Sequence, residues 1–130
     1  MLVVSATASF IVTIDGPAGT GKSTVAHRLA KRLGLEFLDT GAMYRAAGLT
    51  ALERGIEPAD GPRVAELVRG MDLHFDWTSD PPELFADGVA VGERIRTPEV
   101  TRAVSAVASN PLVRAAMVES QRLIATPSAK

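Results

Sequence analysis

Residues 14–24 read IDGPAGTGKST, a stretch rich in glycine and hydroxyl side chains around one lysine. The spacing from Gly16 to Ser23 fits G-x-x-x-x-G-K-[ST] at every fixed position. Because glycines lack Cβ atoms, consecutive backbone N–H groups can converge there on phosphate oxygens. In such a loop Lys22 reaches the β- and γ-phosphates, and Ser23 offers a hydroxyl to Mg²⁺. The stretch predicts a nucleoside triphosphate site; the alternative is a glycine-rich turn that matches by chance.

A second group of candidate residues lies in LDTGAMYRAAG, residues 38–48. Thr40, Tyr44 and Arg45 follow a short apolar run, at the edge of a sheet that would also carry the phosphate loop. Arg45 there could hold a second phosphate bidentately, and the alternative is a solvated helix arginine. The loop alone does not choose the reaction, because GTPases, motor ATPases and small-molecule kinases all carry one.

The elements around these residues are expected to form an α/β sheet. A buried strand is predicted at Phe10–Ile14 and a second at Leu35–Leu38, with the helix of KSTVAHRLAKRLG between them. Asp39 or Thr40 can begin a further helix over about 41–54. This strand–helix–strand–helix order predicts the start of a parallel sheet with right-handed crossovers.

The second half of the chain has a different pattern. LHFDW alternates apolar and polar residues, and Asp87-Gly88 joins two short apolar runs as in a two-residue hairpin. Residues 72–92 therefore predict a small antiparallel sheet inserted into the parallel architecture. Helices are expected from Asp60 or Pro62 to about Arg69, from Thr97-Pro98 to about Ala108, and from Asn110-Pro111 to about Ala125.

Composition sets the remaining bounds. The chain has 130 residues, of which 46% are apolar, so it has the length of one domain with one core. Its net charge of −1 gives no reason to expect a nucleic-acid polymer or a membrane surface as partner. With no cysteine, signal peptide or membrane-spanning run in the sequence, the expected location is cytoplasmic.

Three segments together resemble the bacterial cytidylate kinases: IDGPAGTGKST, FLDTGAMYRA and ERIRTPEVTRAVSAVASNPLVRAAMVESQR. The likeness runs from about Phe10 to Arg122. It implies a P-loop nucleoside monophosphate kinase-like parallel sheet with helices, plus the small antiparallel sheet. Residues 1–130 would then form a single domain, with 56–96 as its inserted monophosphate-binding region. The implied activity is Mg²⁺-dependent transfer of a phosphoryl group from ATP to CMP or dCMP, giving CDP or dCDP.

The resemblance also assigns residues. Lys22 and Arg45 would be catalytic, and Ser23 would meet the metal. Thr40 and Arg45 resemble contacts to the CMP sugar and phosphate, and Arg96 a second arginine at that phosphate. Ser105 and Arg114 resemble contacts to the cytosine ring. The expected ATP-phosphate contacts are Gly16, Pro17, Ala18, Gly19, Thr20, Gly21, Lys22, Ser23 and Thr24.

The sequence departs from the family at its end. Cytidylate kinases continue with an acidic–glycine–arginine–aspartate segment, an arginine-rich lid and further strands, whereas this chain stops at IATPSAK. The expectation is a shortened domain, without the C-terminal strands and lid, that has little or no kinase activity, while the full-length form would be a monomer. Three alternatives stay open: a nucleotide-binding fragment without catalysis, a module completed by a partner chain, and a P-loop kinase with another acceptor.

Overall fold

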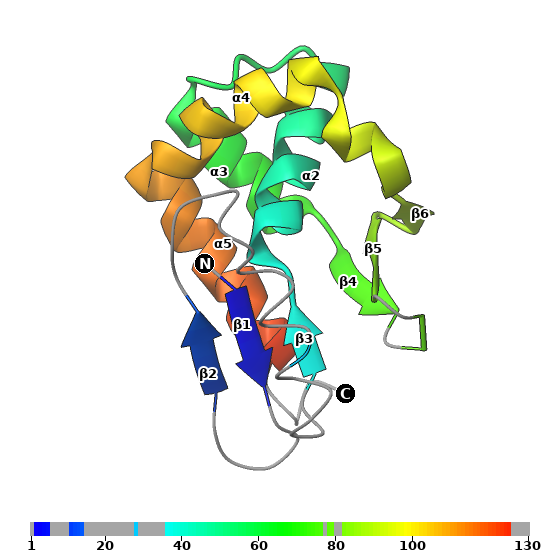
Figure 1. The fold of residues 1–130 in the computed structure, drawn as a ribbon. Coiled ribbons are helices and arrows are strands. Elements are labelled where there is room, and N and C mark those ends of the chain that lie inside the picture. Colours follow the sequence, from blue (N-terminus) through cyan, green and yellow to red (C-terminus); the bar gives the residue numbers. More distant parts are fainter. Residues whose placement is uncertain are drawn as a thin grey trace.

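The computed structural model describes residues 2–5, 11–14, 28, 36–76, 78–79 and 82–125. Within these residues, four helices with defined bounds pack together, and in the view of Figure 1 one small sheet lies at their lower end and a second to their right. The helices are α2 (Thr40–Glu53), α3 (Gly61–Gly70), α4 (Pro98–Ser109) and α5 (Pro111–Ala125), with a 3₁₀ helix, η1 (Gly92–Arg96), before α4. The strands are β1 (Leu2–Ser5), β2 (Ile11–Ile14), β3 (Glu36–Leu38), β4 (Leu73–Asp76), β5 (Glu83–Ala86) and β6 (Val89–Ala90).

The helix starts follow from local side-chain capping. Asp39, Asp60 and Thr97 each accept a hydrogen bond from a backbone N–H in the first turn of the helix that follows. Asn110 does the same for α5, with its Oδ1 accepting from the N–H of Leu112 at 2.9 Å. Because these caps satisfy donors that have no partner within the helix, they fix where each helix begins. The helices predicted from these residues are confirmed.

α2 is the central element of the helical layer. It contacts α3, α4, α5 and η1, and reaches both sheets through β1 and β5. Its inner positions are mostly small, so neighbouring helices approach closely; Gly48, for example, lies against Ala103 of α4. The other large contact is between α3 and α5. The core includes Met43, Ala47, Val64, Val68, Val107, Val113 and Met117, all fully buried.

The sheet formed by β1, β2 and β3 differs from the expected parallel pair. Its strand order is β2-β1-β3, and β1 pairs antiparallel with both neighbours. β2 and β3 therefore run in the same direction, but they are not adjacent. The prediction was wrong because the N-terminal residues LVVS were not recognised as a strand. Their run of β-branched residues suits a strand, and their backbone groups hydrogen-bond to both neighbours.

The small sheet of residues 72–92 is confirmed. Its order is β4-β5-β6, with antiparallel pairing throughout. Asp87 and Gly88 occupy the two turn positions with φ of 51° and 82°, the left-handed conformations that a tight hairpin turn requires. Leu73 and Phe75 point into the core, as the alternation predicted. Trp77, predicted in the same strand, lies outside the described residues.

Candidate functional site

Arg45 joins α2 to the two elements that follow the small sheet. Its Nη1 donates to the carbonyl oxygen of Ile95 in η1 at 3.2 Å and to Oγ1 of Thr101 in α4 at 2.9 Å. Arg45 is therefore not simply a solvated helix arginine. Both bonds leave from Nη1, so the Nε–Nη2 edge of the guanidinium is the edge on which an anion could bind bidentately.

Tyr44 and Arg114 form a second contact, between α2 and α5. The Arg114 guanidinium lies near the Tyr44 hydroxyl, close enough to affect its ionisation. Burial raises the pKa of the Tyr44 phenol above its ordinary value, and the nearby charge of Arg114 lowers that pKa in part. The guanidinium itself belongs to an exposed residue. Two adjacent residues of α2 thus reach three other elements: Tyr44 faces Arg114 of α5, and Arg45 contacts η1 and α4.

Thr40 lies at the first position of α2 and is 1% exposed. Within the described part of the chain, its Oγ1 is one of two buried side-chain polar atoms without a hydrogen-bond partner, the other being Nε2 of Gln121. A buried hydroxyl without a partner is costly and uncommon. In this arrangement a sugar could contact Oγ1 only if the groups that cover it moved.

The structure brings some of the other predicted residues near Arg45. Arg96 follows Ile95 directly, so it lies next to the carbonyl that Arg45 binds, and its side chain is exposed. Ser105 is exposed on α4, one helical turn after Thr101. Arg45, Arg96 and Ser105 are therefore grouped around the junction of α2, η1 and α4. Ser105 and Arg114 form no hydrogen bond with each other.

The donor half of the predicted site lies outside the described residues. This covers the glycine loop of residues 16–24, with Lys22 and Ser23, and the residues after it up to 35, except for Arg28, which is helical. Among the residues that the structure describes, no group of three or more His, Asp or Glu could hold a metal ion. The predicted metal contact, Ser23, lies outside the described residues. None of the described helices is long and apolar enough to cross a membrane.

No role for two residues of this junction, Thr101 and Tyr44, was predicted from the sequence. Thr101 received no role, yet it holds Arg45 in place. It gave no signal, because its partner is 56 positions away in sequence. Tyr44 was noted beside Arg45 without a role. Its position four residues after Thr40 places both on one face of a helix, which is the signal that could have found it.

A junction that presents several arginines beside a sheet-linked helix is typical of proteins that bind phosphorylated small molecules. Comparison with known proteins identifies the class. Residues 12–130 match the profile of the cytidylate kinase family. The chain belongs to this family. Its fold class is thus that of the P-loop nucleoside monophosphate kinases, and the described residues show the helices and the small antiparallel sheet of that class.

Individual relatives agree. A cytidylate kinase from Bordetella pertussis is 42% identical over 126 residues, which cover 97% of this chain and 55% of that protein. One from Limosilactobacillus fermentum is 51% identical over 114 residues, which cover 88% and 50% respectively. A bifunctional pantoate ligase/cytidylate kinase from Acaryochloris marina is 46% identical over 115 residues. The chain spans about half the length of the single-function relatives named here.

Proposed function

We propose that this chain carries the acceptor site and the phosphate loop of a CMP or dCMP kinase. The observation that supports this most is the Arg45 junction, which occurs in a chain of the cytidylate kinase family. There, Nη1 of Arg45 makes two hydrogen bonds, and the Nε–Nη2 edge has no hydrogen-bond partner among the described residues. A second arginine, Arg96, follows Ile95 directly and is exposed. Two such cations are suited to a phosphate monoester.

The acceptor would be held in three places. Arg45 and Arg96 bind the CMP phosphate, which positions it and neutralises its charge. Thr40 binds the sugar, after a movement that uncovers its hydroxyl. Ser105 and Arg114 bind the cytosine ring, where a hydroxyl and a guanidinium match its carbonyl and ring nitrogen. Because the Arg114 guanidinium already lies near the Tyr44 hydroxyl, we expect it to be partly oriented before the nucleotide arrives.

The donor would be held by residues 16–24. Their backbone N–H groups and the Lys22 ammonium bind the ATP phosphates, with the Ser23 hydroxyl as a ligand for Mg²⁺. When bound, Mg²⁺ neutralises charge on the phosphates.

The reaction is a displacement at phosphorus. An oxygen of the CMP phosphate attacks the γ-phosphorus of ATP, a new P–O bond forms, and the bond from that phosphorus to the β–γ bridging oxygen breaks. CDP and ADP are the products. The protein supplies alignment and positive charge rather than a covalent intermediate. Arg45 acts here as a catalytic residue because it contacts the phosphate that attacks.

A coupled assay of ADP formation from ATP and CMP tests the proposal on this chain. CMP and dCMP are compared with UMP, AMP and GMP, and the affinities for ATP and for CMP are measured beside turnover. The proposal expects CMP or dCMP to bind in preference to the others, and Arg114→Met to lower that preference.

The separate measurements distinguish the other functions. Affinity for both nucleotides without turnover would indicate a binding module rather than a catalyst. Turnover that is independent of CMP, or that prefers another monophosphate, would overturn the proposed acceptor.

A further inference from the structure

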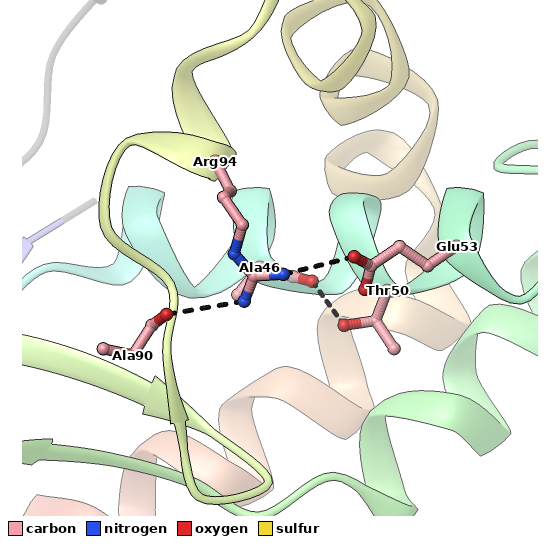
Figure 2. Close-up of polar contacts among 5 residues, drawn as sticks. All are labelled: Ala46, Thr50, Glu53, Ala90 and Arg94. Atoms are coloured by element: carbon pink, nitrogen blue, oxygen red, sulfur yellow. Dashed lines mark hydrogen bonds and ion pairs between the residues drawn. The ribbon is translucent and has the colours of Figure 1, made fainter.

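Arg94 makes a bridge in η1 that none of the functional assignments uses. Its Nη1 donates to Oε2 of Glu53 in the last turn of α2 at 3.2 Å. Its Nη2 donates to the carbonyl oxygen of Ala90 at the end of β6 at 3.4 Å. Figure 2 shows the Arg94 guanidinium between these two oxygens. One side chain therefore connects the hairpin, η1 and α2.

In the sequence of η1, Arg94 lies two residues before Arg96, which is assigned to the proposed phosphate site. Arg94 contacts Glu53, Ile95 is buried and its carbonyl accepts from Arg45, and Arg96 is exposed. Three consecutive residues of η1 thus have different directions. In a 3₁₀ helix with three residues per turn, tying down residues 94 and 95 sets the direction in which residue 96 leaves the helix.

The two ties to α2 lie far apart along that helix. Arg45 is in its second turn and Glu53 is its last residue, so they are eight positions, or about 12 Å, apart along the helix axis. The buried Ile95 side chain and the hydrogen bond from Arg45 hold the middle of η1, and rotation of η1 about this anchor would still be possible. A second contact at the far end of α2 removes that freedom.

We propose that the Glu53–Arg94 pair is a positioning device for the acceptor phosphate site: it orients η1 so that Arg96 lies beside Arg45. The inference rests on the proposed function, because it assigns Arg96 to the CMP phosphate. Arg94 and Glu53 are positioning residues and contact no substrate.

The exposure of the pair points to orientation rather than stability. The side chains of Arg94 and Glu53 are 48% and 52% exposed. Ion pairs this exposed add little to folding stability, so their loss leaves the melting temperature nearly unchanged. They can still bias the population of one η1 orientation by about three- to fivefold, and the apparent affinity for a ligand of that orientation changes by the same factor.

The test compares two ligands that differ only in the phosphate. Arg94→Gln should weaken CMP binding about three- to fivefold and leave cytidine binding unchanged, both measured by calorimetry on the whole chain. A general loss of structure would weaken both ligands together. The same substitution in an Arg96→Gln background should have no further effect on CMP, because the arginine that it positions is gone. The charge reversal Glu53→Arg with Arg94→Glu should restore most of the CMP affinity.

Arg102→Gln is the matched control. Arg102 is an exposed arginine of similar type, 3.9 Å from Glu99 within α4, so its pair joins no two elements. The substitution removes the same unit of charge near the same junction. It should change CMP affinity less than Arg94→Gln does, and an equal effect would show that only long-range charge matters, which would overturn the proposal.

A ligand-free measurement separates this inference from the proposed function. Residual dipolar couplings of the amides in η1, taken relative to those of α2, should change in Arg94→Gln and not in Arg102→Gln. Unchanged couplings overturn the positioning role, whatever binds. If the couplings change but Arg94→Gln binds CMP as tightly as the wild-type protein does, the link to the phosphate site is overturned. Failure of wild-type protein to bind CMP overturns the proposed function and this link with it, whereas the couplings still decide whether Arg94 orients η1.

Discussion

The two ends of α2 satisfy their polar groups in different ways. Near its start, and counting only the described residues, Thr40 has a buried hydroxyl without a partner, Tyr44 is half-buried near Arg114, and Arg45 makes its two hydrogen bonds from one nitrogen. Near its end, Thr50 donates to the Ala46 carbonyl at 2.9 Å, as Figure 2 also shows. Beyond it, Glu53 and Arg54 each have an oppositely charged partner in the region of the small sheet.

This difference indicates that the start of α2 serves ligand binding, whereas its end serves the packing of neighbouring elements. The first turns hold the buried Thr40 hydroxyl, which is costly without a partner, and the half-buried Arg45, which is placed to bind an anion. The last turn holds groups that are paired and solvated, which attach the small sheet and η1 at little cost or gain in stability. Substitutions in the first half should therefore change ligand binding most, and those in the second half should change it little unless they move η1.

The largest expected effect is on Arg45. Arg45→Met should weaken CMP binding by between about 10- and 100-fold, because a hydrogen-bonded charge pair with the phosphate is lost. Arg54→Met is the control at the other end of the helix, and it should stay within about twofold, since its partner Asp87 lies 3.7 Å away in the hairpin turn. Calorimetric titration of both variants with CMP measures the ratio, and equal losses would contradict the difference between the two ends.

Gly61→Ala should disturb the helix packing that both ends of α2 share. A Cβ at Gly61 would overlap the side-chain amide of Asn110, whose Oδ1 caps α5. Displacing that cap should lower the free energy of unfolding by about 1–2 kcal/mol. Gly70→Ala, at the other end of α3 with no atom within 4 Å of its added Cβ, should be neutral or slightly stabilising. Denaturant unfolding of the two variants checks this, and equal stabilities would refute the packing argument.

A pair of threonine substitutions compares an unpaired hydroxyl with a paired one. Thr40→Val should raise stability by up to about 1 kcal/mol, because it removes a buried polar atom without a partner, and should weaken CMP binding if the sugar uses that hydroxyl. Thr50→Val should lower stability by about 0.5–1 kcal/mol, because its hydrogen bond to Ala46 is lost, and should leave CMP binding unchanged. Opposite signs of the two stability changes support the account; the same sign counts against it.

The smallest expected effect is on the ionisation of Tyr44, the only tyrosine of the chain. Burial raises its pKa above 10.0, so the folded state favours the protonated phenol. This stabilisation is present below the ordinary pKa and is lost as the pH rises through the raised value.

Arg114→Gln should raise the pKa of Tyr44 further, since Arg114 now lowers it. The ultraviolet absorbance of the phenolate follows the titration directly, without interference from other tyrosines. Arg69→Gln, which removes an exposed arginine from α3, serves as the control. A lower pKa of Tyr44 in Arg114→Gln would show that Arg114 does not lower this pKa in the wild-type protein.

The elements with local signals could be predicted from the sequence. Asp39, Asp60, Thr97 and Asn110 cap their helices within a few residues, so the pattern around each is sufficient. The hairpin at Asp87 and Gly88 is equally local, because its turn needs two left-handed residues in succession. These features depend on neighbours in the chain, and they were found.

The features that depend on distant partners could not be predicted in this way. β1 has one distant partner, β3, whose paired residues lie more than 30 positions away, whereas its pairing with β2 is local and was overlooked. The contacts of Arg45 with Ile95 and Thr101, and of Arg94 with Glu53, join separations of 50, 56 and 41 positions. Resemblance to a family named several residues of the site, but it did not show what holds them in place. The packing around α2 shows that.

The most direct test of the central claim, that the junction of α2 with η1, α4 and α5 accepts CMP, is a calorimetric comparison of CMP with UMP. These ligands share sugar and phosphate, and differ only in the edge of the base that Ser105 and Arg114 would contact. The account predicts that wild-type protein binds CMP more tightly than UMP and that Arg114→Met removes most of the difference. Equal affinity of wild-type protein for the two nucleotides, or a preference that survives in Arg114→Met, would contradict it.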